Sequence, residues 1–299
     1  DTENRRSYRT AQLPSDGNQT LLQEAGLLRI GMFTAGYQRY PLEKAFSDAK
    51  KFGYDFIELW GGRPWTYAPD ILSHEAETIR ALSEKYGMPI EGYTPEHNAY
   101  PFNYMAGRYA QRKASVEYLK SALIAGKAIG ARFTLVSTGH AGYGLTRREI
   151  EKRLYEALSA LTELAEEIGH KILLETLTPY ETNVCTTAAD LKEVLDKIDS
   201  PALSGMCDLA VPFSVREPVM NYFELLGSRI EHLHIIDNDG VSDGHLVPGE
   251  GVMPLKEILQ EIKDFGYDGT ATIELVTAYI HEPSVYAKRA VDNLRTMIG

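Results

Sequence analysis

Short β-rich runs alternate with amphipathic helical segments about eight times between residues 28 and 299. Helical patterns such as residues 148–169 and 254–266 end at a glycine, which suits a helix C-terminus. About eight strand–helix pairs in roughly 270 residues match a TIM barrel, and no GxGxxG or Walker sequence favours a doubly wound sheet. We therefore expect an α/β fold, a single-domain (β/α)8 TIM barrel. The predicted strands cover residues 28–34, 55–60, 88–94, 131–137, 171–177, 202–208, 230–236 and 269–275.

A near repeat supports this fold. FGYDFIELW occupies residues 52–60, and FGYDGTATIEL occupies residues 265–275. Each copy reads as a helix end, a Gly-Tyr-Asp turn and a strand that carries Ile-Glu-Leu near its far end. Such a repeat is typical of consecutive strand–helix units. Residues 1–27 are polar and lack the apolar segment of a signal peptide, so we interpret them as an N-terminal extension and assign the barrel to residues 28–299.

Composition and charge limit the class of protein and its partners. The 299 residues carry a formal net charge of −11, which disfavours a general grip on nucleic acid phosphates or on anionic membranes. No apolar run approaches the roughly 18 residues that span a bilayer. The two cysteines, Cys185 and Cys207, form neither a CxxC nor a dense pattern, which indicates a reduced, cytoplasmic protein. The expected partner is a small molecule, with no nucleic acid and no membrane.

The stretch EHLHIIDNDG, residues 231–240, places two histidines two positions apart on an apolar run. In a strand His232 and His234 share one face, so at least one imidazole points into an interior and needs a partner there. That partner is either a protein group, as in an ordinary core, or a metal ion. His234 lies nearer the C-terminal rim of the barrel and is the predicted ligand. His232 lies one layer lower and is expected to be satisfied by protein groups.

Three acids close apolar runs at predicted strand ends, where core residues would otherwise be expected. They are Glu175, Asp208 and Glu274, and together with His234 they should converge at the C-terminal face of the barrel. Three carboxylates beside one imidazole repel one another unless a cation lies among them. A lone strand-end acid is more often a capping or solvated residue, but four such residues at one rim favour a metal site. The oxygen-rich set suits Mn²⁺, Mg²⁺ or Co²⁺, with Zn²⁺ as an alternative.

Several stretches are similar to a known family. LLETLTPYETN, MCDLAVP, HLHIIDNDGVSDGHLVPGEG and TIELVT resemble the metal and substrate loops of the xylose-isomerase-like TIM barrels. Within that family the resemblance is greatest to the fructoselysine 3-epimerases, which are related to the ketose 3-epimerases, and it runs from about Leu28 onward. It implies an isomerase that inverts C3 of a ketose and that assembles as a homo-oligomer.

The resemblance also implies roles for individual residues. Ketose 3-epimerases hold a divalent metal by a Glu, an Asp, a His and a second Glu, which fall here on Glu175, Asp208, His234 and Glu274. Mn²⁺ is the expected ion, with Co²⁺, Mg²⁺, Ni²⁺ or Zn²⁺ as alternatives. The family mechanism passes through a metal-stabilised enediolate, and Glu175 and Glu274 are the expected catalytic pair that transfers the C3 proton.

Four further residues are candidates for substrate binding. Glu181 matches a substrate-contacting glutamate of the ketose 3-epimerases, although a loop carboxylate in water is the alternative interpretation. Arg63 in GGRP and His140 in GHAGY follow predicted strands at the functional rim. His245 in SDGHLVPGEG is the fourth candidate.

Two positions depart from the free-ketose enzymes and narrow the expected substrate. Those enzymes carry a substrate-binding His where Val211 stands and an Arg where Gly240 stands. The loss of two polar contacts favours a C1-substituted ketose, of which fructoselysine (with its epimer psicoselysine) is the family's example. The rim carboxylates Glu96 and Asp243 would suit the cationic lysine end. The alternative is a free-ketose 3-epimerase of the psicose or tagatose type, or another sugar isomerase of the superfamily.

Two other classes of protein are weighed against this interpretation. Asp243 and His245 resemble a metal-ligand pair of the endonuclease IV branch, whose members repair DNA with a three-metal cluster. That branch needs the His that Val211 replaces, and it needs basic DNA-binding loops, which a net charge of −11 disfavours. A non-catalytic sugar-binding protein would not require two opposed carboxylates on one metal.

Overall fold

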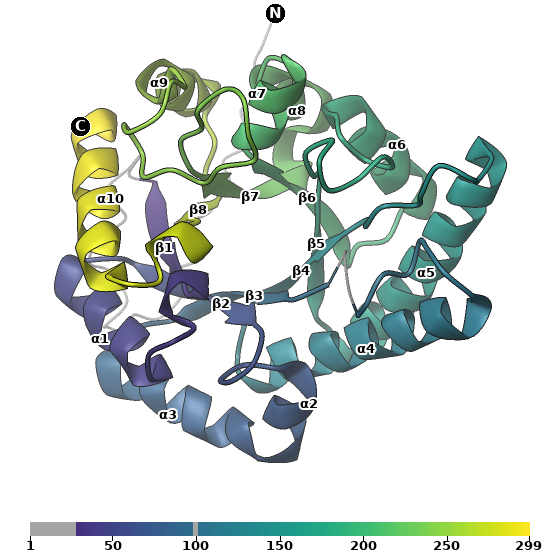
Figure 1. The fold of residues 1–299 in the computed structure, drawn as a ribbon, viewed down its shortest axis with the longest axis horizontal. Coiled ribbons are helices and arrows are strands. Elements are labelled where there is room, and N and C mark those ends of the chain that lie inside the picture. Colours follow the sequence, from purple (N-terminus) through teal and green to yellow (C-terminus); the bar gives the residue numbers. More distant parts are fainter. Residues whose placement is uncertain (1–27, 98–100) are drawn as a thin grey trace, which may run out of the picture.

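The chain forms a closed barrel of eight parallel strands, which confirms the predicted fold (Figure 1). This computed structural model describes residues 28–97 and 101–299, so the predicted extension, residues 1–27, lies outside the described residues. Each strand pairs with its neighbours in sequence, and the last strand closes the ring on the first. The strands are β1 (Arg29–Phe33), β2 (Phe56–Gly61), β3 (Ile90–Pro95), β4 (Phe133–Ser137), β5 (Lys171–Glu175), β6 (Leu203–Asp208), β7 (Ile230–Ile235) and β8 (Thr270–Ile273).

The eight strands lie where the sequence predicted them, and one end differs in a way that concerns the site. β8 ends at Ile273, so Glu274, which was expected to be a strand residue, follows the strand. Its backbone N–H still donates a 3.3 Å hydrogen bond to the carbonyl of Ile235 in β7. This bond anchors Glu274 at the rim of the barrel.

Helices surround the barrel on its outside, as Figure 1 shows. Among the described residues, no helix is long and apolar enough to cross a membrane. The helices are α1 (Leu42–Phe52), α2 (Ala68–Asp70), α3 (Ala76–Tyr86), α4 (Tyr109–Ala128), α5 (Arg147–Ile168), α6 (Ala188–Ile198), α7 (Ala210–Val215), α8 (Met220–Leu226), α9 (Leu255–Phe265) and α10 (Pro283–Ile298), with short turns η1 (Ala35–Tyr37), η2 (Ile71–Glu75), η3 (Gly227–Arg229) and η4 (Thr277–Tyr279).

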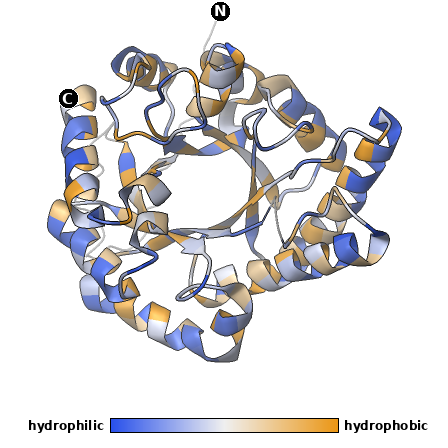
Figure 2. Cartoon of the chain, viewed as in Figure 1, coloured by the Kyte–Doolittle hydropathy of each residue, from blue (hydrophilic) through white to orange (hydrophobic). Residues whose placement is uncertain are grey.

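Local sequence signals set the ends of these helices. α5 begins after Thr146, whose side chain caps the backbone N–H of Glu149 while the Glu149 side chain returns to the backbone of Thr146. α5 and α9 end at Gly169 and Gly266, which adopt left-handed φ values of 63° and 87° that side chains disfavour. Figure 2 shows hydrophilic residues on the outward helix faces and hydrophobic ones toward the strands. The helices therefore cover the barrel with an apolar face, as their amphipathic patterns predict.

The interior of the barrel differs from the layer between strands and helices. The large apolar core lies in that outer layer, whereas a small separate cluster consists of Phe133, Leu135, Leu173 and Met206. Fully buried polar side chains also occur on strands that are not neighbours, and their mutual contacts cross the interior. These side chains include Glu58 of β2 together with His232 and His234 of β7. The barrel therefore encloses a polar network beneath its C-terminal face.

Candidate active site and metal centre

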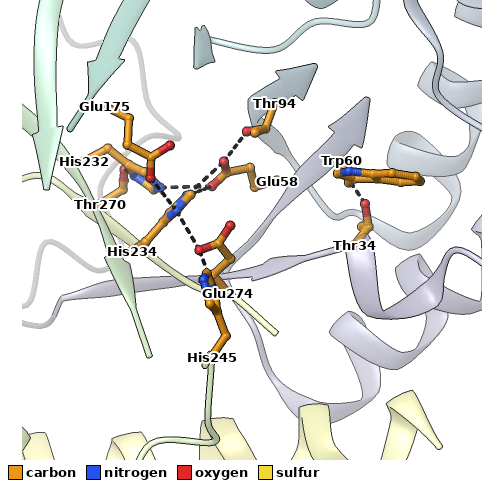
Figure 3. A network of polar contacts seen from close by, with 10 residues as sticks. All are labelled: Thr34, Glu58, Trp60, Thr94, Glu175, His232, His234, His245, Thr270 and Glu274. Carbon is orange, nitrogen blue, oxygen red and sulfur yellow. Dashed lines mark hydrogen bonds and ion pairs between the residues drawn. The ribbon is translucent and has the colours of Figure 1, made fainter. Parts of the chain in front are cut away.

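Side chains from three strands and from the residue after a fourth meet at the C-terminal rim. Glu175 ends β5, Asp208 ends β6, His234 precedes the last residue of β7, and Glu274 follows β8. The Nδ1 atom of His234 lies 3.3 Å from a carboxylate oxygen of Glu175 and 3.2 Å from one of Glu274. Figure 3 shows these two glutamates on either side of the imidazole. Residues far apart in sequence thus share one small volume.

Two overlapping groups of potential metal ligands include Asp208. The first contains Glu175, Asp208 and His234, and the second contains Asp208, His245 and Glu274. Within each group, one ligand atom per residue lies within 4.8 Å of the others. His245 Nδ1 also lies 3.1 Å from a carboxylate oxygen of Glu274. The structure therefore brings the four predicted ligands together and places His245, a predicted substrate contact, at their edge.

The hydrogen-bonding state of this site indicates what it could hold. Among the described residues, Nδ1 of His234, Nδ1 of His245 and Oε2 of Glu274 are buried without a hydrogen-bond partner. Buried polar atoms are normally paired, so three such atoms directed toward one another need an explanation. Imidazole nitrogens and carboxylate oxygens are the ligands of divalent first-row metals. The donor set therefore fits a divalent metal ion.

Burial and mutual repulsion govern the charges of the carboxyl groups. Burial raises the pKa of Glu175 to about 7, against the lowering effect of His234 and with further raising by Glu274 and Asp208. Burial and the charge of Glu274 raise the pKa of Asp208 to about 6. Burial would also raise the pKa of Glu274, but His234 and His245 beside it hold it well below its usual range. A carboxyl group with a pKa near 7 can act as both acid and base at neutral pH.

We expect the affinity of this site for a divalent metal to rise with pH from about pH 6 upward. The pKa of Glu175 is about 7 and that of Asp208 about 6, so protons occupy these oxygens below neutrality, whereas a metal needs the carboxylates. Burial would lower the pKa of His234, but Glu274 and Glu58 raise it well above its usual value, so this ligand must release a proton as well. For each ligand that must release a proton, metal affinity falls about tenfold for every pH unit below the pKa of that ligand. Titration with Mn²⁺ against a competing chelator at three pH values measures the effect, and a pH-independent affinity would contradict it.

The two histidines of β7 occupy different layers, as the strand pattern predicted. Nδ1 of His232 lies 2.7 Å from the hydroxyl of Thr270, and its Nε2 lies 3.0 Å from a carboxylate oxygen of Glu58. Protein groups thus satisfy both of its ring nitrogens, and burial lowers the pKa of His232. Nε2 of His234 also faces Glu58, at 3.1 and 3.2 Å from the two oxygens, and its Nδ1 faces the rim.

Glu58 is the candidate functional residue that sequence reasoning missed. Its carboxylate is fully buried in the barrel interior and faces both histidines (Figure 3). Burial would raise the pKa of Glu58, but the adjacent His234 and His232 bring it well below the usual value. The near repeat contained the signal, because Ile-Glu-Leu at 57–59 matches Ile-Glu-Leu at 273–275 and makes Glu58 the counterpart of Glu274.

A cavity of about 390 Å³ adjoins the cluster. Its lining includes the predicted substrate contacts Glu181 and His245, and also the rim carboxylates Glu96 and Asp243. The indole of Trp60 lines it as well and donates a 2.7 Å hydrogen bond to Glu96. None of the described lining residues is Lys or Arg. The cavity is therefore strongly anionic and suits a metal ion together with a neutral or cationic ligand.

Two predicted substrate contacts lie outside the lining of this cavity. The guanidinium of Arg63 donates hydrogen bonds of 2.8 and 2.9 Å to Asp70 and lies over the ring of Tyr67. Nδ1 of His140 accepts a 2.8 Å hydrogen bond from the backbone N–H of Gly142 and so orders its own loop. The structure does not bring either side chain to the cluster, and their substrate contacts stay predictions.

Comparisons with known proteins place the chain in a family. The model of the xylose isomerase-like TIM barrel family matches residues 46–297. The fructoselysine 3-epimerase of Shigella flexneri is 48% identical over 271 residues, which cover 91% of this chain and 98% of the relative, and that of Escherichia coli O157:H7 gives the same values.

Solved structures share the fold at low sequence identity. The 3-keto-D-glucoside 4-epimerase from E. coli is 18% identical with a TM-score of 0.75, over 91% of this chain and 99% of that one. The IOLI protein with a bound zinc atom is 16% identical with a TM-score of 0.76, over 91% and 98% of the two chains. From the matched family model and the close relatives, we conclude that the chain belongs to the xylose isomerase-like TIM barrel family.

Proposed function

We propose that this protein is a divalent-metal-dependent 3-epimerase of a C1-substituted ketose, which interconverts fructoselysine and psicoselysine. The observation that carries the proposal is the 48% identity to fructoselysine 3-epimerases over 91% of the chain. That identity makes the chain a sugar epimerase. Inversion at C3 and dependence on a metal are further parts of the proposal. The arrangement of Glu175 and Glu274 around Nδ1 of His234 supports both.

In this proposal Glu175, Asp208, His234 and Glu274 hold the metal ion. The unpartnered Nδ1 of His234 and Oε2 of Glu274 support this assignment. The oxygen-rich set favours Mn²⁺, with Co²⁺, Mg²⁺, Ni²⁺ or Zn²⁺ as alternatives. A bound ion would supply positive charge that stabilises the negative oxygens of the substrate's enediolate.

Inversion at C3 requires that a proton leave one face of the carbon and that another arrive on the opposite face. Glu175 and Glu274 approach from β5 and from the end of β8, on either side of His234 (Figure 3). Glu175 would take or return a proton on its own face of C3 as a general base or acid. Glu274, whose pKa lies well below its usual range, is deprotonated and would act on the opposite face. Their roles exchange when the reaction runs in the other direction.

The charge of the cavity supports a substrate with a cationic part. Beyond the metal ligands, Glu96, Glu181 and Asp243 line the cavity. Burial, followed by the charges of Asp243 and Glu175, raises the pKa of Glu181 to about 8, and the part that comes from these two acids reflects negative charge around Glu181. Fructoselysine carries an amine next to C1 and an amino acid end, and its cationic groups would be attracted here. A free ketohexose offers no such charge.

The cellular setting belongs to the same proposal. Cys185 and Cys207 are both free and buried, in keeping with the reducing cytoplasm that we propose as its location. The resemblance to the family supports a homo-oligomer, with residues 1–27 as an extension of a barrel that spans residues 28–299. Arg63 and His140 are retained as proposed substrate contacts at the rim.

Solvent exchange at C3 tests the proposal. The Mn²⁺-loaded protein is incubated in D₂O with fructoselysine, psicose, tagatose or fructose in separate samples, and after removal of the metal, deuterium at C3 is measured by NMR. Fructoselysine is expected to exchange fastest and to yield psicoselysine, and a chelator-treated sample is expected to show no exchange. Faster exchange with psicose or tagatose would identify a free-ketose 3-epimerase instead. Full activity in verified metal-free protein would contradict the metal site.

A further inference from the structure

A buried carboxylate lies directly behind the proposed metal ligand His234. Glu58 comes from β2, His234 comes from β7, and neither strand is the other's neighbour in the barrel. Both side chains are fully buried. Burying a carboxylate away from water costs free energy unless hydrogen-bond donors surround it. The donors around Glu58 therefore indicate its role.

The hydrogen bonds around Glu58 are consistent with a single arrangement of protons. The hydroxyl of Thr94 lies 2.5 Å from Oε1 and can only donate to a carboxylate. His232 donates from Nε2 to Oε2 at 3.0 Å, which leaves its Nδ1 to accept from the hydroxyl of Thr270 at 2.7 Å. His234 donates from Nε2 to the same carboxylate at 3.1 and 3.2 Å. In neutral His234 the lone pair therefore resides on Nδ1, the nitrogen that faces Glu175 and Glu274.

We propose that Glu58 is a positioning residue, which fixes the tautomer and ring orientation of His234 so that Nδ1 is presented to the metal, while His232 and Thr94 hold Glu58 in place. This inference rests on the proposed metal site. It adds Glu58, which is not one of the four proposed ligands. Imidazole ligands of metals commonly donate their other ring nitrogen to such an acceptor, and its removal typically weakens metal binding about 10- to 100-fold. Glu58 does not itself line the cavity, although Thr94, which donates a hydrogen bond to it, does, and Glu58 acts on the proposed metal position through His234.

The neighbouring strand is shaped around this side chain. Gly92 of β3 lies opposite Glu58, and a Cβ atom there would lie 2.8 Å from Cγ of Glu58 and 2.7 Å from the ring of Phe133. The register between β2 and β3 also shifts at Ile57/Glu58, an irregularity of the kind that redirects side chains. Both features leave room for Glu58 inside the barrel.

A second metal site at Glu58, His232 and His234 is the competing interpretation, because their ligand atoms also lie within 4.8 Å of one another. In this group, however, the carboxylate oxygens of Glu58 and the Nε2 atoms of both histidines are hydrogen-bonded to one another. Nδ1 of His234, on the other side of the ring, has no hydrogen-bond partner among the described residues. Hydrogen bonds satisfy the first group, and only the second calls for a cation. Metal stoichiometry separates the two interpretations.

Glu58→Gln tests the inference, because glutamine keeps the shape but replaces one acceptor oxygen by a donor. The single amide oxygen cannot accept from Thr94, His232 and His234 together, so the hydrogen bond to Nε2 of His234 is lost or weakened. The tautomer of His234 with its proton on Nδ1, which cannot bind the metal, is then favoured. We expect one Zn²⁺ per wild-type chain in a chelator-competition titration, and binding about 10- to 100-fold weaker in the variant. In ¹⁵N-histidine-labelled, Zn²⁺-bound protein, NMR is expected to show His234 protonated on Nε2 in the wild type, with loss of that signature in the variant.

Glu91→Gln is the matched control. Glu91 is also a buried glutamate of the barrel, but it pairs with Arg29 and Arg132 at the opposite end of the strands. It is expected to change thermal stability and to leave Zn²⁺ affinity within about twofold, because it contacts no ligand. If Glu58→Gln fails to fold, Thr94→Val removes one donor to Glu58 and should weaken binding in the same direction by a smaller factor.

The outcomes distinguish this inference from the proposed function. Wild-type protein that binds no Zn²⁺ would overturn the metal site and with it the role of Glu58. Equal affinity of wild type and Glu58→Gln would overturn the positioning role alone and leave the metal site standing. Two ions in the wild type and one in Glu58→Gln would show that Glu58 is itself a ligand. Weaker binding of a single ion, with Glu91→Gln unchanged, supports the inference.

Discussion

Glu274→Gln is expected to lower the rate of C3 inversion about 10²- to 10⁴-fold at saturating metal, because it removes one of two proton carriers. Glutamine keeps an oxygen that can face the metal but loses the charge and the ability to accept the proton. Metal affinity should fall as well, so turnover is compared only after saturation is verified. In D₂O, Glu175 remains able to exchange the proton on its own face. Residual deuterium uptake without inversion is therefore the signature of the two-carboxylate mechanism.

Glu250→Gln is the control for Glu274→Gln. Glu250→Gln breaks the exposed ion pair with Arg289 and should leave turnover within about twofold, since surface pairs contribute little. Thermal unfolding of both variants checks that the fold is intact. Unchanged turnover in Glu274→Gln would eliminate the two-carboxylate mechanism even if the metal were bound.

His234→Ala is expected to lose bound metal and activity together. The imidazole supplies Nδ1 to the centre of the cluster, 3.3 Å from Glu175 and 3.2 Å from Glu274. Loss of one of four ligands should weaken metal binding by more than the about 10- to 100-fold that follows loss of a ligand's hydrogen-bond partner. Metal content after dialysis and the rate of C3 exchange measure the two effects in one preparation.

His232→Ala is the matched comparison from the same strand. It removes an equally buried imidazole whose partners are Thr270 and Glu58, and so it leaves a cavity and deprives Glu58 of a donor. We expect a loss of about 2 to 4 kcal/mol in unfolding free energy, with one metal still bound per chain at saturation. If His232→Ala empties the site while His234→Ala keeps it filled, the metal lies on the other side of Glu58.

Local patterns in the sequence were sufficient for the barrel and for most of the candidate site. Strand and helix periods depend on residues a few positions apart, so the eight strands could be located without tertiary information. A parallel barrel places all strand C-termini at one face, so Glu175, Asp208 and His234 could be expected to meet. His245 and Glu181, which lie in long loops, reached the same cavity.

Other parts of the site could not be predicted in this way. Arg63 and His140 follow strands at the correct rim, yet Arg63 pairs with Asp70 at the end of α2, and His140 accepts a hydrogen bond from the backbone of Gly142 in its own loop. Strand-end position therefore indicates which side of the barrel a residue occupies but not which way its side chain turns. That direction depends on nearby partners that compete with the cavity.

The sequence by itself determined the fold, the two layers of the histidine pair and the acids that accompany His234, because alternation and strand order are properties of the chain. Only the tertiary structure decided what His234 meets on its other nitrogen. Glu58 lies 176 residues away in sequence and reaches His234 across the interior, on a strand that is not a neighbour. Such a contact exists only once the barrel has closed, when a buried carboxylate must take whatever donors the opposite wall presents.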